Sequence, residues 1–343
     1  MIKESQLLPV VSTIDQWNII LTNRCNLHCV TCSYPDQRPH RFVRREVIQR
    51  HLDAMLDAGL TRVLLTGGEP CMHPHFDEIV EDLHEAGLEI TLVTNGTYLR
   101  RHLDAIAGRL TRLIISMDGP DAETYADIRG ARAFDHLVTL PALVRERSPE
   151  TALTICVVIQ RRNFRSLPDF LRLGKALDVD RVSFLAPDLV GMKAPVERGG
   201  AFGHLEPLDE ERVEAVALTL DEVDELREEV LPAIEAIVAA DPELGNDSIA
   251  QIHTYADYFE AFRRGRPRGD RRRCALPFRE VVLDEKERFR FCFFMPEAWP
   301  ARGVADPVNH EGVVAMRSEY LASDERLDAF CDMCVQAARA GEE

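Results

Sequence analysis

The sequence predicts an α/β fold built on a parallel sheet, followed by a helical connector and a small cysteine-containing unit. Three observations lead to this prediction. The first two hundred residues alternate short β-branched or apolar runs with longer helical patterns, which is typical of repeated βα units. The 343 residues leave room for two packed units, and 45% hydrophobic with 29% charged residues is an ordinary globular composition. The nine cysteines form one group of three, one of four and two single residues.

Six strands and five helices are predicted to alternate over this first part. The strands are expected near 17–22, 62–66, 89–94, 112–117, 152–159 and 181–186. The helices are expected near 44–58, 75–86, 98–107, 134–147 and 167–177, with Gly59 and Gly87 as C-terminal caps of two of them. Polar or glycine-rich turns follow the strands: TNRCN, TGGEP, TNGT, SMDGP, QRRN and APD. The loops at the carboxyl ends of parallel strands lie on one face, so we expect these six motifs to meet.

The pattern changes after residue 187. Residues 190–204 are rich in glycine and contain Pro195, which predicts a loop, and 209–240 have the periodicity of one or two long acidic helices. A short helix is expected to end near 262, a hairpin to cover 280–294 and a helix to cover 314–330. We therefore expect a βα domain at 1–205, a helical connector at 206–265 and a cysteine domain at 266–343.

Charge and hydropathy exclude several classes of function. The apolar runs are shorter than the 18 or so residues that a membrane span requires, and the N-terminus carries no export signal, so we expect a cytoplasmic protein. The formal charge of −17 and the sparse aromatic residues argue against a nucleic-acid partner. Residues 206–243 hold 14 acids and two arginines, whereas 263–273 hold seven arginines and one Asp. Both runs are expected to be solvated, although the second leaves a local anion site open.

The first cysteine group has the spacing C-x3-C-x2-C. Cys25, Cys29 and Cys32 are closely spaced thiols on one predicted loop, as ligands of a soft metal centre would be. Three ligands leave one iron of a [4Fe–4S] cluster free to bind a chelating small molecule. The alternative is a zinc ion completed by His28 or His40, but a zinc ion would not account for the other motifs at the strand ends.

These motifs, in this order, resemble the radical S-adenosylmethionine (radical SAM) superfamily. The resemblance covers about residues 15–190 and includes CNLHCVTC, in which Thr31 replaces the aromatic residue usual before the last Cys. It implies a partial (βα)6 TIM barrel, an S-adenosylmethionine cofactor bound to the cluster, and a protein reductant such as flavodoxin or ferredoxin. In this chemistry, reductive cleavage of the sulfonium produces a 5′-deoxyadenosyl radical, which abstracts a hydrogen atom from the substrate.

The resemblance also implies which residues contact S-adenosylmethionine. The GGEP motif would hold the methionine amino group, Ser116 and Asp118 would contact the ribose, and Arg129 would contact a carboxylate. The physical chemistry agrees, since two glycines allow close approach of the backbone and a buried Glu69 can accept hydrogen bonds from an ammonium group. The implied cofactor-binding residues are Gly67, Gly68, Glu69, Pro70, Asn95, Ser116, Asp118 and Arg129.

The second cysteine group ends in C-x2-C and by itself would favour structural zinc. Its members are Cys274, Cys292, Cys331 and Cys334. After a radical SAM barrel, this group with its intervening hairpin and helix resembles the twitch module, a shortened SPASM domain that carries one auxiliary [4Fe–4S] cluster. The hairpin lacks the usual turn glycine and has Glu285, Lys286 and Glu287 there. The cofactors implied are therefore S-adenosylmethionine and two [4Fe–4S] clusters.

A cluster with four cysteine ligands is expected to relay an electron rather than bind substrate, which favours net oxidation. The leading hypothesis is a radical SAM oxidoreductase that dehydrogenates a secondary alcohol of a sugar or aminocyclitol in natural-product biosynthesis, including antibiotic biosynthesis, as twitch-domain aminocyclitol dehydrogenases do. The alternative is a maturase of a ribosomally made peptide. We rank it second because such enzymes often have a peptide-recognition domain of about 80 residues before the barrel, whereas about 16 residues precede the first strand here.

Two other hypotheses remain. A radical epimerase would use a free cysteine as hydrogen donor, and Cys71 or Cys156 could serve, although both are more simply explained as packed core residues. A non-catalytic iron–sulfur sensor belongs to a different class and would not cleave S-adenosylmethionine. The sequence identifies no general base.

Four further side chains lie next to the predicted strand ends. His73 and His75 are expected to be loop and helix-start residues rather than metal ligands. Arg161 and Arg162 could hold a substrate oxygen or carboxylate.

Overall fold

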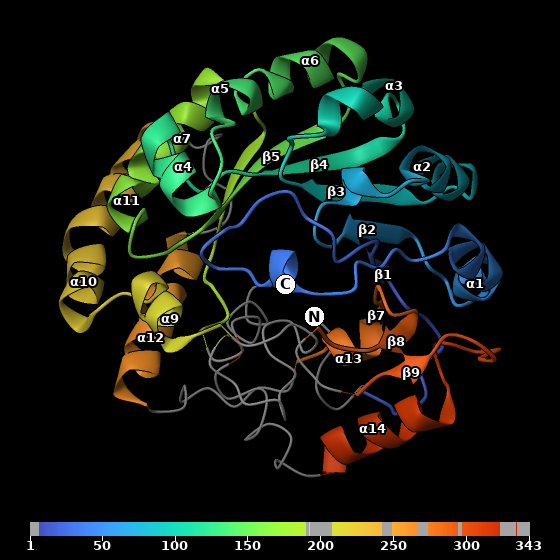
Figure 1. Ribbon diagram of the computed structural model, residues 1–343. Helices are drawn as coiled ribbons and strands as arrows, with labels where there is room; N and C mark the ends of the chain where they lie inside the picture. The colour runs from blue at the N-terminus through green and yellow to red at the C-terminus, as the bar shows by residue number, and fades with distance from the viewer. Residues whose placement is uncertain are drawn as a thin grey trace.

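The computed structural model describes residues 7–189, 192, 208–241, 249–265, 274–293, 297–322 and 334. Its centre is a sheet with the strand order β6-β5-β4-β3-β2-β1-β7-β8-β9. Six consecutive parallel strands curve into an open barrel, as Figure 1 shows, and the C-terminal hairpin continues the same sheet. The predicted α/β fold with a partial barrel is confirmed.

The six barrel strands lie within a few residues of their predicted positions. They are β1 (Gln16–Ile20), β2 (Arg62–Thr66), β3 (Glu89–Thr94), β4 (Leu110–Ser116), β5 (Ala152–Val158) and β6 (Arg181–Leu185). Their side chains alternate between two environments, as the pleat of a strand requires. In β4, Leu113 and Ile115 are buried on the side that packs against the helices, whereas Ile114 and Ser116 on the other side are only partly buried.

Helices cover the outer side of this arc (Figure 1). The predicted helices α1 (Arg45–Asp57), α2 (Phe76–Glu85) and α7 (Leu167–Ala176) are present. The helix predicted at 98–107 is instead a 3-10 turn, η4 (Leu99–His102), followed by the short helix α3 (Leu103–Ile106). Further single turns are η2 (Tyr34–Asp36), η3 (Pro70–Met72) and η5 (Phe164–Ser166).

Two local signals change the helices after β4. The helix predicted at 134–147 is two helices, α5 (Phe134–Leu137) and α6 (Leu140–Arg147). Pro141 lies in the first turn of α6, and its ring would clash within a continuous helix. An additional helix, α4 (Ala122–Arg129), was not predicted. Asp121 caps its N-terminus by accepting from two backbone amides, and Gly130 ends it with φ 68°.

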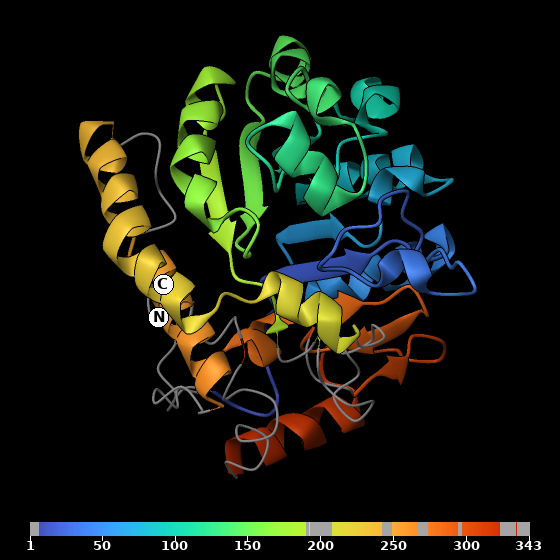
Figure 2. The ribbon, with the colours of Figure 1, turned by 60° about the vertical axis from the view of Figure 1, so that its left-hand side comes forward.

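The connector forms several helices along one side of the barrel (Figure 2). Thr219 and Glu222 form a capping box, so the acidic stretch predicted as one or two long helices is interrupted after α9. The helices are α9 (Glu210–Val216), α10 (Leu220–Glu225), the π-helical turn η8 (Leu226–Val230), α11 (Leu231–Ala240) and α12 (Ile249–Arg264). Pro232 is the second residue of α11 and its nitrogen cannot donate to the preceding turn, which accounts for the change of helical register at η8.

The described part of the C-terminal unit packs on the open edge of the barrel sheet. Its elements are α13 (Leu276–Arg279), β7 (Glu280–Leu283), β8 (Arg288–Arg290), β9 (Trp299–Pro300) and α14 (Glu311–Ala322). Strand β7 pairs in parallel with β1, with Gln16 opposite Glu280, and then turns back into β8. The sheet therefore crosses the predicted boundary at residue 266, and the division into domains stays a prediction.

The hairpin turn forms without glycine. Glu287 adopts the left-handed conformation, with φ 57°, at the position where a glycine is common. The Asp284 carboxylate accepts hydrogen bonds from the backbone amides of Lys286 and Arg288, both at 3.0 Å, and so closes the turn. The helix predicted at 314–330 begins three residues earlier, at Glu311, and its part beyond Ala322 lies outside the described residues.

In the described ranges, no helix combines the length and the apolar character that a bilayer crossing demands.

Candidate functional site

The loop that follows β1 carries the first three cysteines and lies on the concave side of the arc of strands (Figure 1). Each thiol accepts a hydrogen bond from an N–H group. Asn95 Nδ2 donates to Cys25 Sγ at 3.7 Å, and Arg129 Nη1 donates to Cys29 Sγ at 3.8 Å. The backbone amide of Tyr34 donates to Cys32 Sγ at 3.4 Å. Sulfur ligands of iron–sulfur clusters receive such hydrogen bonds, which tune their charge, so this donor set fits a soft, anionic centre.

The same three thiols are shielded from solvent by the surrounding motifs. Burial raises the pKa of Cys25 to about 11 and that of Cys32 to about 12, and it also raises the pKa of Cys29, against the opposing effect of Arg129. A buried thiol in this environment stays protonated unless a cation replaces its proton. Binding of a metal centre at this loop would therefore release protons.

The grouping of the side chains does not distinguish a single zinc ion from a cluster at this loop. Within the described ranges, no three His, Cys, Asp or Glu side chains are grouped closely enough to hold one metal ion. This holds for the loop with Cys25, Cys29 and Cys32, and for His28 and His40 beside it.

The two glycines of the GGEP motif allow two loops to touch. A Cβ at Gly67, where φ is 141°, would lie 2.5 Å from the carbonyl oxygen of Thr22, and a Cβ at Gly68 would lie 2.3 Å from that of Arg24. The Gly68 amide donates to Thr22 O at 2.7 Å, and the Glu69 amide donates to Arg24 O at 2.8 Å. These glycines are predicted from the sequence to let a ligand approach the backbone closely. In the structure, the chain that approaches them is the protein's own backbone leading into the cysteine loop.

Glu69 is fully buried and joins the ends of β2 and β3. Its Oε1 accepts from the Thr94 hydroxyl at 2.6 Å and from the Cys71 amide at 3.1 Å, and its Oε2 accepts from the Asn95 amide at 2.8 Å. Burial raises the pKa of Glu69, and the three hydrogen bonds act in the opposite direction. Since a carboxylate has about four acceptor sites, one direction remains for a further donor such as an ammonium group.

Asp118 and Arg129 form a buried ion pair, with Arg129 Nε 2.7 Å from Asp118 Oδ2. The other oxygen, Oδ1, accepts from the Val158 amide at 2.8 Å, so both oxygens of Asp118 have partners within the protein. The pair connects the end of β4 to α4 and to Cys29. The ribose contact predicted for Asp118 and the carboxylate contact predicted for Arg129 stay predictions, and the structure adds a function in holding the site together.

The remaining predicted residues lie at the ends of β2, β4 and β5. Ser116 pairs with Cys156 across β4 and β5, and Cys156 pairs with Ser183 on β6, so the three form a row of partly buried side chains. Pro70 and Cys71 are buried in η3, and the Cys71 sulfur contacts the Thr94 hydroxyl at 3.8 Å. Cys71 therefore packs beside Glu69, whereas Cys156 lies on the side of the sheet that faces the barrel interior.

Four polar residues beside the strand ends are engaged within the protein. Arg161 forms an ion pair with Glu222 at 2.9 Å and Arg162 with Asp127 at 2.9 Å, so the possible substrate contacts of these arginines are not supported. His73 Nε2 lies 2.8 Å from Val43 O, and His75 precedes α2 as its N-cap, in agreement with their prediction as loop and helix-start residues.

The second cysteine group is described only in part. The hydroxyl of Tyr320 on α14 accepts from the Cys274 amide at 2.8 Å, which places this helix beside the first cysteine of the group. Cys274, Cys292 and Cys334 are partly buried, whereas Cys331 lies outside the described residues. The auxiliary cluster on these four cysteines stays a prediction.

Three residues of the site were not identified from the sequence. Tyr34 supplies the amide that reaches Cys32. Tyr125 is fully buried, its hydroxyl has no hydrogen-bond partner among the described residues, and burial raises its pKa to about 12. Arg212 on α9 contacts the cysteine loop from a distance of 180 residues in sequence. The Tyr34 contact is local, but no sequence signal links Arg212 to Cys29 and Cys32.

Residues 19–174 match the sequence model of the Radical SAM superfamily. The PqqA peptide cyclase of Rhodopseudomonas palustris is 34% identical over 166 residues, which are 47% of this chain and 44% of that protein. The chain thus spans less than half the length of this relative.

Two solved structures share the fold. SuiB of Streptococcus suis, bound to the precursor peptide SuiA, superposes with a TM-score of 0.63 and 16% identity, covering 90% of this chain and 68% of that one. The structure of anSMEcpe with bound AdoMet and the Cp18Cys peptide superposes with a TM-score of 0.62 and 14% identity, covering 96% and 88%. At these identities the likeness is one of fold.

Proposed function

Since residues 19–174 match the sequence model of the Radical SAM superfamily, we propose that the chain is an enzyme that reductively cleaves S-adenosylmethionine on a [4Fe–4S] cluster held by Cys25, Cys29 and Cys32. The observation that carries this proposal is the set of N–H donors on the three thiols, one from Asn95, one from Arg129 and one from the Tyr34 amide. These donors would stabilise three thiolates that share a metal centre, whereas three buried cysteines of a packed core would have no use for them.

When bound, the cluster and S-adenosylmethionine supply a radical that takes a hydrogen atom from the substrate. The residues of this chain bind and orient the cofactor. Glu69, held by Thr94 and the Asn95 amide, offers its remaining acceptor direction to the methionine ammonium group. Gly67 and Gly68 keep the GGEP turn packed on the cysteine loop, so that the cluster ligands and Glu69 stay at a constant separation. Ser116 is proposed as a ribose contact because it is partly exposed at the end of β4.

The proposed substrate is a peptide. The PqqA peptide cyclase is similar in sequence to part of this chain. The two solved structures with the same fold are described with bound peptides. These comparisons favour the maturase alternative over the sugar or aminocyclitol dehydrogenase that the sequence pattern placed first. The proposal keeps net oxidation as the reaction class, with an auxiliary cluster on Cys274, Cys292, Cys331 and Cys334 as the electron acceptor.

The first experiment tests S-adenosylmethionine cleavage. The anaerobically reconstituted chain, reduced with dithionite, should release 5′-deoxyadenosine, and Cys29→Ala should release none. Cys71→Ala serves as the matched control, because it also removes a buried cysteine next to the site but no proposed ligand. Equal release by the wild type and Cys29→Ala would contradict the proposal.

The second experiment tests the substrate class. A library of short peptides and a panel of sugars and aminocyclitols are each incubated with the reconstituted enzyme, and 5′-deoxyadenosine above background is measured with the mass of any product. Stimulation by peptides alone is expected, with a product two hydrogens lighter. Stimulation by an aminocyclitol alone would restore the small-molecule dehydrogenase and overturn the peptide assignment.

A further inference from the structure

One side chain of the connector reaches the cysteine loop. Arg212, in the first turn of α9, donates from Nη2 to the carbonyl oxygen of Cys32 at 2.9 Å and to that of Cys29 at 3.1 Å. Its Nη1 lies 3.4 Å from the carboxylate of Asp36, which is largely exposed. The guanidinium group therefore bridges the carbonyls of two of the three proposed ligands, and its partner carboxylate is in solvent.

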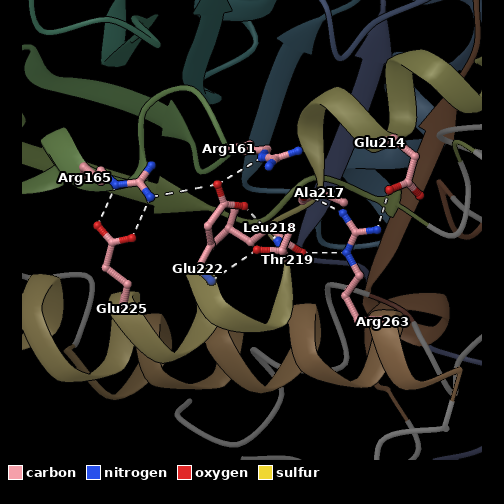
Figure 3. A network of polar contacts seen from close by, with 9 residues as sticks. All are labelled: Arg161, Arg165, Glu214, Ala217, Leu218, Thr219, Glu222, Glu225 and Arg263. Carbon is pink, nitrogen blue, oxygen red and sulfur yellow. Dashed lines mark hydrogen bonds and ion pairs between the residues drawn. The ribbon is translucent and has the colours of Figure 1, made fainter.

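The position of Arg212 is fixed at both ends of α9. At the N-terminus, the Asp209 side chain accepts from the Arg212 backbone amide at 2.8 Å. At the C-terminus, Arg263 of α12 donates to the carbonyl oxygens of Ala217 and Leu218, both at 2.6 Å, and pairs with Glu214 at 2.5 Å (Figure 3). A cation at a helix C-terminus also interacts favourably with the helix dipole. The helix is thus capped at each end by a charged side chain.

The next turn of the connector is attached to the barrel. Arg161 and Arg165 come from the segment after β5, and Figure 3 shows them pointing toward α10. Arg161 pairs with Glu222 at 2.9 Å, and Arg165 pairs with Glu225 at 2.5 Å through two parallel hydrogen bonds. Because paired hydrogen bonds between a guanidinium and a carboxylate restrict orientation, these contacts hold α10, and through Thr219 the end of α9, against the barrel.

The contact has an electrostatic consequence for a cluster on the loop. A cluster gains negative charge on reduction, and a nearby cation stabilises the reduced state more than the oxidised one. Hydrogen bonds to the ligand carbonyls also restrict the loop, whose backbone otherwise bonds through the Cys32 amide to Cys29 O and through the Val30 amide to Ile128 O.

We propose that Arg212 is a positioning residue that couples the connector to the cluster loop, raises the reduction potential of the cluster on Cys25, Cys29 and Cys32, and slows its loss. This inference rests on the proposed function, because it requires a cluster at that loop. The connector would then influence the redox properties of the cluster through the contact between α9 and the cysteine loop.

The test compares Arg212→Gln, Arg212→Lys and Arg227→Gln in the full reconstituted chain. Arg227 is the matched control, since it lies on the same connector with 29% of its side chain exposed, against 32% for Arg212, and pairs with Asp257 and Glu260. The midpoint potential is measured by redox titration of the electron paramagnetic resonance signal that changes when S-adenosylmethionine is added. Iron release to a chelator is followed in parallel.

Arg212→Gln should shift the midpoint potential to a more negative value and release iron about tenfold faster, as expected for the loss of a charge-assisted hydrogen bond. Arg212→Lys should have a midpoint potential close to that of the wild type, because the positive charge remains. Its rate of iron release should lie between those of the wild type and Arg212→Gln. Arg227→Gln should match the wild type in both. If Arg212→Gln takes up no iron while Arg212→Lys does, the positioning role is also supported.

Failure of the inference about Arg212 can be distinguished from failure of the proposed function. If Arg212→Gln binds iron and matches the wild type in potential and iron release, the inference about Arg212 is overturned while the proposed function stands. If the wild type and Cys29→Ala contain equal iron and neither shows a signal that responds to S-adenosylmethionine, the proposed function itself has failed.

Discussion

At the scale of single residues, Glu69 shows how one buried carboxylate organises the site. It accepts from three donors that belong to two different strand-end motifs, so its position depends on β2 and β3 together. The energetic cost of burying this carboxylate is visible in its raised pKa. Such a cost is tolerated where the group is needed for binding.

Glu69→Gln should therefore impair both stability and cofactor binding. An amide presents a donor NH2 where the carboxylate accepts, so one of the Thr94, Cys71 and Asn95 donors loses its partner, at a cost of about 1–3 kcal/mol. Affinity for S-adenosylmethionine should fall about tenfold or more if the ammonium contact is lost. Thermal melting and isothermal titration measure the two effects. Glu85→Gln, at an exposed position on α2, is the control, and equal affinity in both variants would contradict the ammonium contact.

The two single cysteines allow a test of the reaction class. Cys71 is buried beside Thr94, and Cys156 lies on the barrel side of β5. Under net oxidation, Cys71→Ala and Cys156→Ala should each keep product formation, and Cys71→Ala should cost about 1–2 kcal/mol of stability for the lost packing. Product mass is recorded in H2O and in D2O. A product with the mass of the substrate in H2O that gains one deuterium at carbon in D2O, and that disappears in either variant, would identify an epimerase instead.

At the scale of elements, the β7–β8 hairpin depends on charge at its turn. Asp284 is fully buried, and Arg288 and Arg290 approach its Oδ2 at 2.7 and 3.0 Å. Burial alone would raise the pKa of Asp284, but the hydrogen bonds and charges of the two arginines hold it below its usual value. Arg290 is itself buried, so loss of this carboxylate removes one charged partner of a buried cation.

Asp284→Asn should destabilise the fold in a manner that depends on pH. Because the pKa of Asp284 is lower in the folded than in the unfolded state, its contribution is fully present above about pH 4 and is lost as pH falls through the folded value. Near pH 7 the variant should be less stable by about 3–5 kcal/mol. The difference should shrink at more acidic pH. Urea denaturation at several pH values measures it, with Asp53→Asn, at an exposed position on α1, as control. A difference that does not change with pH would contradict the assignment.

Proline and capping residues decide where the helices end. Pro141 separates α5 from α6, and Thr219 with Glu222 starts α10 after a break. Both signals are local and were present in the sequence, but the hydrophobic periodicity continues across each of them, so periodicity alone predicts longer helices. Local signals also mark α4, because Asp121 caps its N-terminus and Gly130 ends it. Periodicity did not reveal this helix.

At the scale of the whole molecule, the continuous sheet brings the C-terminal unit next to the barrel. The parallel pairing of β7 with β1 places the first strand of the hairpin beside the strand that leads into the cysteine loop. Asn18 on β1 donates to the Glu280 carboxylate on β7 at 2.8 Å, and Arg279 pairs with Asp15. If both cysteine groups hold clusters, the two clusters therefore belong to units that share one sheet.

The iron content of the whole chain tests this arrangement. Three and four ligands predict two [4Fe–4S] clusters, or about eight irons per chain after anaerobic reconstitution. A variant with Cys25, Cys29 and Cys32 all replaced by Ala should keep about four. Replacement of Cys331 and Cys334 should remove the other four and leave some cleavage of S-adenosylmethionine. Metal analysis that finds about four irons and one zinc in the wild type would show that the second group is a zinc site.

The sequence alone determined the order of the six barrel strands, the three cysteines after the first strand and the polar motifs at the strand ends. These features are local in the chain: periodicity, caps and motif spacing depend on neighbouring residues, and the parallel order follows from repeated βα units. Only the tertiary structure decided the contacts between distant segments. Glycines 67 and 68 approach the cysteine loop, Arg129 contacts Cys29 and Arg212 contacts Cys29 and Cys32 because separate elements pack together. No pattern in a single segment specifies where a long, flexible guanidinium will find its partner, because that depends on which surfaces the folded chain brings within reach.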